Sequence, residues 1–218
     1  MSRGADRRER LAAARLYLVT DGGMPDGAVR SALAGGVDMV QLRDPLLADD
    51  VLIEVATRLR AACDDHGALL WINDRPDLAL RAGADGVHVG QDDMAVAEVR
   101  RKVADDMLIG LSTHAPDQLE AGIRSGADQL SVGPVWETPT KPGRPAAGLG
   151  YLRLAAQRKP AVPWFAIGGI DESNVGDVTG AGAERIVVVR AVREAPDPGA
   201  AASRLRAALE GSTVGAAQ

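Results

Sequence analysis

Short apolar runs alternate with longer amphipathic stretches along most of the chain. The runs are almost continuously hydrophobic, which is typical of parallel strands that are buried on both faces. The stretches between them have the helical spacing of apolar positions. Seven helices are therefore predicted between eight strands, and an eighth helix is predicted near 199–209. The predicted strands are 16–20, 39–43, 69–72, 86–89, 108–111, 129–132, 164–167 and 185–189.

A recurring sequence motif marks the junction between several predicted helices and the following strands. It consists of Gly, then Ala or Val, then an acidic residue, and an apolar run follows. Glycine at this place is suited to end a helix with a positive φ angle. The four occurrences are Gly36-Val37-Asp38, Gly83-Ala84-Asp85, Gly126-Ala127-Asp128 and Gly182-Ala183-Glu184.

Strict alternation of eight strands with helices predicts an α/β fold of the TIM (β/α)8 barrel type in a single domain. A doubly wound open sheet is the alternative, but no Gly-x-Gly-x-x-Gly follows the first strand. Residues 1–14 are predicted as a leading helix or tail, 15–210 as the barrel, and 211–218 as a flexible tail.

Composition narrows the functional classes. The 218 residues are 46% hydrophobic and carry a net charge of −5 with both signs interspersed, so neither nucleic acid nor an anionic membrane is expected as a partner. No apolar run approaches the roughly 20 residues that span a bilayer. The single cysteine, Cys63, excludes a disulfide framework and favours a reducing, cytoplasmic location. The sequence does not determine the oligomeric state, and a homo-oligomer is one of the alternatives.

Two aspartates follow neighbouring predicted strands. Asp74 comes after 69–72, and Asp93 comes after 86–89. Parallel neighbours end on the same side of the sheet, so the two carboxylates are expected side by side, where they can hold Mg²⁺ through oxygen ligands. The alternative is that each aspartate caps the helix that follows it.

Other polar residues also gather after the predicted strands, where barrel enzymes carry their active sites. Thr138-Pro139-Thr140-Lys141 can surround a phosphate or form only a surface turn. Arg43 can bind an anion bidentately or form a structural ion pair. His88 is interpreted as a core histidine, and His114 as either an acid–base group or a helix-capping residue. The remaining residues of this kind are Gln41, Asp44, Asn73, Gln91, Asp92, Ser112, Thr113, Gly168, Gly169 and Arg190.

These motifs, in this order from about Leu16 to about Leu209, resemble the thiamine-phosphate synthase family. The resemblance rests on Gln41-Leu42-Arg43, Asn73-Asp74-Arg75, His88-Val89-Gly90-Gln91-Asp92-Asp93, Ser112-Thr113-His114, Gly133-Pro134 with Thr138-Pro139-Thr140-Lys141, and Ile167-Gly168-Gly169-Ile170.

The resemblance implies that a hydroxymethylpyrimidine diphosphate and a hydroxyethylthiazole phosphate condense by a dissociative route to thiamine phosphate and diphosphate. It also implies Mg²⁺ as cofactor, held by Asp74 and Asp93, with small-molecule substrates as the partners. Catalytic roles are implied for Arg43, Ser112 and Lys141. The implied substrate-binding residues are Gln41, Leu42, Arg43, Asp44, Asn73, Ser112, Thr138, Pro139, Thr140, Lys141, Gly168, Gly169, Val189 and Arg190.

Two positions depart from the family pattern. Pro45 stands where the family usually has a lysine that faces the diphosphate, and Arg190 stands where many members have a small serine. Two alternative functions are also weighed, the first of them because of Pro45. One is the related thiazole phosphate tautomerase with His114 as proton shuttle, and the other is a non-catalytic barrel that binds phosphorylated metabolites.

Overall fold

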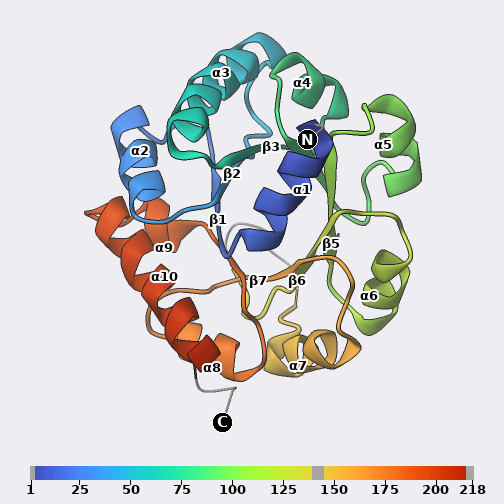
Figure 1. The fold of residues 1–218 in the computed structure, drawn as a ribbon, viewed down its shortest axis with the longest axis vertical. Helices are drawn as coiled ribbons and strands as arrows, with labels where there is room; N and C mark the ends of the chain where they lie inside the picture. Colours follow the sequence, from blue (N-terminus) through green and yellow to red (C-terminus); the bar gives the residue numbers. More distant parts are fainter. Residues whose placement is uncertain (1–2, 139–144, 215–218) are drawn as a thin grey trace.

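The computed structural model describes residues 3–138 and 145–214. Its eight parallel strands pair in chain order, and β8 pairs with β1, so the sheet closes into a barrel (Figure 1). This closure confirms the predicted (β/α)8 barrel and contradicts the open-sheet alternative. The strands are β1 (Leu16–Thr20), β2 (Met39–Leu42), β3 (Leu69–Asn73), β4 (Gly86–Val89), β5 (Leu108–Thr113), β6 (Gln129–Val132), β7 (Trp164–Ile167) and β8 (Ile186–Val188).

The helices form a ring around the barrel, with the exception of the first one (Figure 1). Their bounds are α1 (Arg3–Ala13), α2 (Asp26–Ala34), α3 (Asp49–His66), α4 (Pro76–Arg81), α5 (Val96–Lys102), α6 (Pro116–Ile123), α7 (Gly148–Arg158), α8 (Val175–Gly180), α9 (Arg190–Arg193) and α10 (Pro198–Val214). The sequence patterns did not predict α9, and α10 includes residues 211–214, which were predicted to belong to a flexible tail. Within the described ranges, no helix has both the length and the apolar composition needed to cross a membrane.

Alternation along each strand divides the core into two clusters. Side chains such as Leu18 and Val40 point outward and pack under the helices. Side chains such as Tyr17 and Trp71 point inward and fill the barrel. The ring of Trp71 occupies space that Gly86 leaves, since a β-carbon on Gly86 would lie 2.6 Å from that ring. The interior is therefore a packed core rather than a channel.

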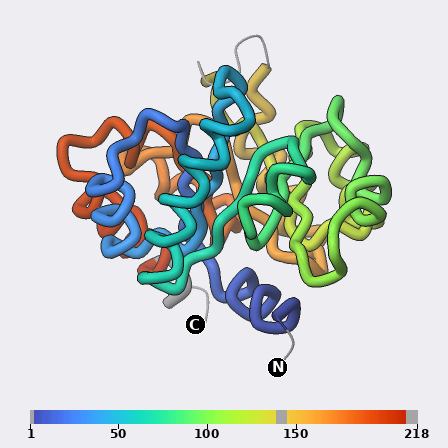
Figure 2. Tube along the Cα trace, turned by 90° about the horizontal axis from the view of Figure 1, so that it is seen from above, coloured from blue at the N-terminus to red at the C-terminus, as the bar shows by residue number. Residues whose placement is uncertain are grey.

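Helix α1 closes the amino-terminal end of the barrel. It crosses that opening in Figure 1 and lies beneath the remaining fold in Figure 2. Leu11 is 2% exposed and belongs to the interior cluster. Arg7 donates from Nε to the Asp85 carboxylate at 2.9 Å, and Arg60 donates to the same carboxylate at 2.5 Å. Helix α1 thus covers this end, and the mouth formed by the carboxyl ends of the strands lies opposite.

Candidate active site

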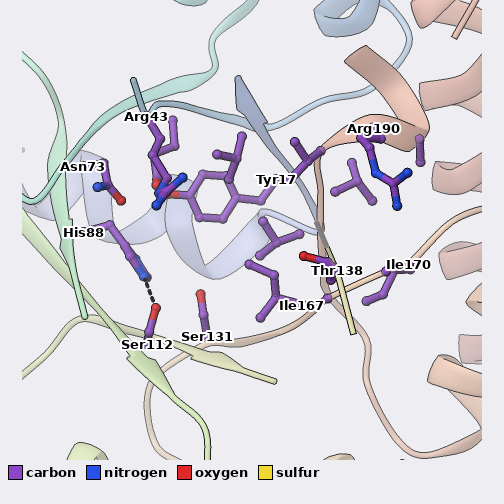
Figure 3. A pocket seen from close by; sticks show the side chains of 18 of the residues that line it. Tyr17, Arg43, Asn73, His88, Ser112, Ser131, Thr138, Ile167, Ile170 and Arg190 are labelled. Atoms are coloured by element: carbon purple, nitrogen blue, oxygen red, sulfur yellow. Dashed lines mark hydrogen bonds between the residues drawn. The ribbon is translucent and has the colours of Figure 1, made fainter. Parts of the chain in front are cut away.

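A cavity of about 310 Å³ opens at the carboxyl-end mouth of the barrel (Figure 3). Tyr17 lies near its middle, with Arg43, Asn73 and His88 toward one end and Thr138, Ile170 and Arg190 toward the other. The cavity is lined by Tyr17, Val19, Gln41, Arg43, Asn73, His88, Ser112, Ser131, Thr138, Ile167, Gly168, Gly169, Ile170, Asp171, Val187, Val188, Val189, Arg190 and Ala191.

The end near β2 and β3 carries polar side chains from the strand tips. Gln41 is buried and donates from Nε2 to the Tyr17 hydroxyl at 2.5 Å. Burial raises the pKa of Tyr17 far above its ordinary value, so the phenol stays protonated at neutral pH. Arg43 Nε is buried and has no hydrogen-bond partner in the part of the chain that the structure describes. This end thus presents a cation and amide groups to a ligand.

His88 and Ser112 meet beside this polar end. The distance from His88 Nε2 to Ser112 Oγ is 2.9 Å, and both residues line the cavity. Gln91 donates from its side chain to the Ser112 carbonyl at 2.6 Å. His88 is 5% exposed, which confirms that it is a core residue. It is also part of the site, which the sequence interpretation did not include.

The opposite end is lined largely by backbone after β7 and β8. Gly168 and Gly169 have φ angles of 107° and 70°. A β-carbon on Gly168 would lie 2.5 Å from Pro134 Cα, so only glycine fits there. Val189 and Arg190, where α9 begins, complete this end. Backbone N–H groups that a glycine pair leaves accessible are suited to an oxyanion.

Thr138 is the only member of the predicted phosphate loop within the described residues, and it lines the cavity. The other predicted members, Pro139, Thr140 and Lys141, fall outside the described residues.

Asp74 and Asp93 lie beyond the cavity lining, in the loops after β3 and β4. Asp74 has a φ angle of 60°, its N–H donates to the His88 carbonyl at 2.8 Å, and its carboxylate accepts from Asn73 Nδ2. Asp93 is exposed, and its carboxylate accepts from Gly90 N–H at 2.8 Å.

The capping alternative for both aspartates is wrong. The N-cap residues of α4 and α5 are Arg75 and Ala95, and neither helix has a side-chain cap. Within the described chain, no three His, Cys, Asp or Glu side chains group as a metal cluster. The magnesium site therefore stays a prediction that rests on this pair of carboxylates.

Two other predicted binding residues face away from the cavity. Leu42 is fully buried and belongs to the outer core, because it alternates with the inward-pointing Gln41 and Arg43. The Asp44 carboxylate accepts from Gly22 N–H at 3.2 Å and from Leu46 N–H at 3.1 Å. Asp44 thus shapes the loop beside the mouth.

Several lining residues were not anticipated, among them Tyr17, Ser131, Ile167 and Asp171. For some of them, the alternation of side chains along a strand predicts that they face the barrel interior. Tyr17 and Val19 pair in register with Met39 and Gln41, so the inward direction of Gln41 fixes theirs.

Comparison with known proteins places this geometry in a family. The family model described as "Thiamine monophosphate synthase" matches residues 16–192. A thiamine-phosphate synthase of Thermus thermophilus is 53% identical over 180 residues, which cover 83% of this chain and 86% of that protein. One from Nostoc sp. is 50% identical over 198 residues, covering 89% of this chain but 56% of that protein's length.

A solved structure shares the fold. Thiamine phosphate pyrophosphorylase from Pyrococcus furiosus superposes with a TM-score of 0.85 at 31% identity, covering 94% of this chain and 98% of that one. The chain therefore belongs to the thiamine monophosphate synthase family, and it is a transferase of thiamine biosynthesis.

Proposed function

We propose that the chain catalyses the Mg²⁺-dependent condensation of 4-amino-2-methyl-5-(diphosphooxymethyl)pyrimidine with 4-methyl-5-(2-phosphooxyethyl)thiazole to thiamine phosphate and diphosphate. The observation that carries the proposal is one cavity with two chemically different ends. The end near β2 and β3 has a cation and amides, and the end near β7 and β8 has glycine backbone and Arg190.

The cavity suits a reaction that joins two bound rings. The bond between the pyrimidine methylene carbon and the diphosphate oxygen breaks, and the methylene carbon then forms a bond to the thiazole nitrogen. Holding both rings in one pocket makes the second step effectively unimolecular. Apolar side chains such as Val19, Ile167 and Val187 line the cavity and limit the access of water to a carbocation.

The leaving diphosphate needs positive charge and hydrogen-bond donors. Arg43 supplies a permanent charge with a fork of N–H donors, and its Nε is already desolvated. Asn73 adds an amide at the same end, and its side chain also donates to Asp74. The chain itself thus brings a donor set to the point where negative charge develops.

The donor chemistry at the rim fits magnesium. Asp74 and Asp93 provide carboxylate oxygens on the loops of the adjacent strands β3 and β4, and oxygen is the ligand atom that Mg²⁺ prefers. The left-handed backbone of Asp74 is the kind of strain that functional sites retain. Bound there, the ion would neutralise part of the diphosphate charge.

The thiazole phosphate is assigned to the other end. Gly168, Gly169 and the backbone that enters α9 offer N–H groups, and Arg190 adds charge. Arg190 is exposed, so water screens its attraction to a phosphate.

The contacts of His114 weigh against the tautomerase alternative. Its Nδ1 lies 2.6 Å from the Gly133 carbonyl oxygen, and its backbone N–H donates to Gln118 Oε1. His114 does not line the cavity, so it is poorly placed to shuttle a proton on a ligand there.

Incubation of the protein with both substrates, with and without Mg²⁺, tests the proposal. Formation of thiamine phosphate and diphosphate only with the metal is the expected result. Calorimetric binding of the thiazole phosphate without any turnover would instead support the non-catalytic barrel. Conversion of a thiazole phosphate tautomer without coupling would support the tautomerase.

A further inference from the structure

Helix α9 is a single turn that lines part of the cavity. It spans Arg190–Arg193, and Arg190 and Ala191 border the end near β7 and β8. A helix of one turn has too few internal hydrogen bonds to be stable alone. Val192 is buried in the outer core, whereas the other three residues are partly or fully exposed. The position of α9 must therefore depend on its contacts with other elements.

An ion pair holds α9 to the loop after β1. Arg193 Nη1 donates to Asp21 Oδ2, although 172 positions separate the two residues in the chain. Asp21 comes directly after Thr20, the last residue of β1. The two side chains are 29% and 38% exposed, so water screens the pair only in part. Asp21 Oδ1 accepts the Gly23 N–H at 3.0 Å, so the same carboxylate also shapes its own loop.

The loop after β1 is fixed on its other side by the loop after β2. Asp44 Oδ2 accepts the Gly22 N–H at 3.2 Å, and the Arg43 N–H donates to the Thr20 carbonyl at 2.8 Å. A β-carbon on Gly22 would lie 2.7 Å from Leu47 Cδ1, so the two loops pack closely there. The loops after β8, β1 and β2 are thus joined along the mouth of the barrel, and α9 is held to a loop that is itself held in place.

Glu194 is a second acid on the Arg193 guanidinium. Its Oε1 accepts from Arg193 Nη2 at 3.1 Å, and its side chain is 52% exposed. Because Glu194 directly follows Arg193 in the chain, this contact does not tie α9 to another element. Asp21 and Glu194 carry the same charge and meet the same guanidinium, but only Asp21 reaches it from another loop. Glu194 is therefore a matched control for Asp21.

We propose that Asp21 and Arg193 are positioning residues for the thiazole phosphate, because their ion pair fixes α9 and with it the cavity-lining Arg190 and Ala191. The identity of this ligand rests on the proposed function. Neither Asp21 nor Arg193 lines the cavity, so both act through α9 rather than by contact. Charge alone would give Asp21 the opposite role, since a carboxylate at the mouth repels a phosphate. Positioning and charge thus predict opposite effects when the Asp21 charge is removed.

Kinetics of the coupling reaction separate the two effects. Asp21→Asn keeps an oxygen for the Gly23 N–H but replaces the acceptor of Arg193. It should raise KM for the thiazole phosphate about three- to fivefold, with kcat and KM for the pyrimidine diphosphate nearly unchanged. Arg193→Gln should behave alike, the double variant should be no worse than either single one, and Glu194→Gln should keep the wild-type KM. A lower KM in Asp21→Asn, or additive losses, would overturn the proposal.

Amide hydrogen exchange of the free protein tests the ion pair without any substrate. The Arg193 N–H donates to the Val189 carbonyl at 2.9 Å, so its exchange reports on the opening of α9. This amide should exchange at least about threefold faster in Asp21→Asn and at the wild-type rate in Glu194→Gln. Unchanged exchange in Asp21→Asn would overturn the proposal. If the wild-type protein does not couple the two substrates, the proposed function fails, whereas the exchange result still decides whether the ion pair holds α9.

Discussion

The two ends of the barrel differ in that one is covered by a helix and the other opens into the cavity. At the amino-terminal end, α1 covers the opening, and the Asp85 carboxylate takes hydrogen bonds from Arg7, Arg60 and the Leu70 N–H. At the carboxyl-end mouth, Arg43 lines the cavity and keeps a buried Nε without a partner in the described chain. Arg60 at the closed end also keeps such an Nε, but its other guanidinium nitrogens donate to Asp85 and to the Ala68 carbonyl. The difference is that the guanidinium at the mouth faces a cavity, whereas those of Arg7 and Arg60 at the closed end bond within the fold.

Positive φ angles occur at both ends of the barrel. At the mouth they include Asp74, Gly168 and Gly169, and before the strands at the other end they include Gly36, Gly67, Gly83, Gly126 and Gly182. Asp74 is the member of this set that is not a glycine, so its left-handed backbone costs free energy that the rest of the fold must offset. We expect the ion pairs of the closed end to act on stability and the residues that line the cavity to act on ligand binding. Substitutions should therefore separate into those that change stability and those that change turnover.

The largest effect is expected at the carboxylates of the mouth. Asp74→Asn and Asp93→Asn should each lower the coupling rate at least about 100-fold, because the charge that would hold Mg²⁺ is removed. Asparagine tolerates a left-handed backbone, so Asp74→Asn should leave the fold intact. Steady-state kinetics and thermal melts check both points, with Asp92→Asn as the matched control. Wild-type rates in both variants would refute the metal assignment.

At the closed end, Asp85→Asn should lower the free energy of unfolding by about 3 kcal/mol at pH 7, because two guanidinium groups lose their buried counter-charge. The coupling rate should change little. Urea unfolding measures the loss, and exposed Asp65→Asn serves as control because its ion pair with Arg30 is on the surface. A large change in KM without a change in stability would contradict the division of roles.

The Asp85 carboxylate should also make the free energy of unfolding depend on pH. Burial raises the pKa of Asp85, but the hydrogen bonds and ion pairs with Arg60 and Arg7 lower it by a larger amount. The net pKa of Asp85 is therefore below the ordinary value. Its stabilising contribution is therefore present above the ordinary Asp pKa of about 4. It is lost as the pH falls from there toward the folded-state pKa. The stability difference between wild type and Asp85→Asn should narrow over that range in acid unfolding curves.

Gly168→Ala should change both the free energy of unfolding and the binding of substrate. The added carbon meets Pro134 and forces an unfavourable φ angle, which should cost about 2 kcal/mol and raise KM for the thiazole phosphate. Gly176→Ala in α8 is the matched control, because its β-carbon meets nothing within 4 Å. Equal behaviour of the two variants would show that the close approach at Gly168 is unimportant.

The smallest effect is expected for Pro45→Lys. The residue is exposed in the loop after β2, so a lysine there should not disturb the fold. It should raise kcat/KM by less than about fivefold, because water screens an exposed charge. Kinetics at two salt concentrations measure the change, and Ala48→Lys provides an exposed control on the same loop. A loss of activity would show that Pro45 itself shapes the site.

Much of the fold could be predicted, because buried parallel strands leave a simple apolar signature. The predicted strand 16–20 coincides with β1, and 129–132 coincides with β6. Strand β5 extends to Thr113, since Ser112 and Thr113 pair with Ser131 and Val132 of β6. The leading helix was also predicted. Its role as a cover was not, because an Arg-rich sequence gives little sign that Arg7 and Leu11 are buried.

The site was predicted where polar residues stand at or just beyond strand ends, as with Gln41, Arg43 and Asn73. It was missed where an inward-facing residue belongs to an apolar run. Tyr17 belongs to a continuous apolar run, and such a run does not show which positions face inward. His88 was interpreted correctly as buried, but its contact with Ser112 depends on the register between β4 and β5 and on the space left by Gly110.

A crystal structure with Mg²⁺, diphosphate and thiamine phosphate tests the central claim most directly, because it shows which end of the barrel binds the product. The account predicts the pyrimidine ring near Gln41 and Asn73, the phosphate against Gly168 and Gly169, and the ion on Asp74 and Asp93. Product bound anywhere other than the carboxyl-end mouth, or an ion held without either aspartate, would contradict it.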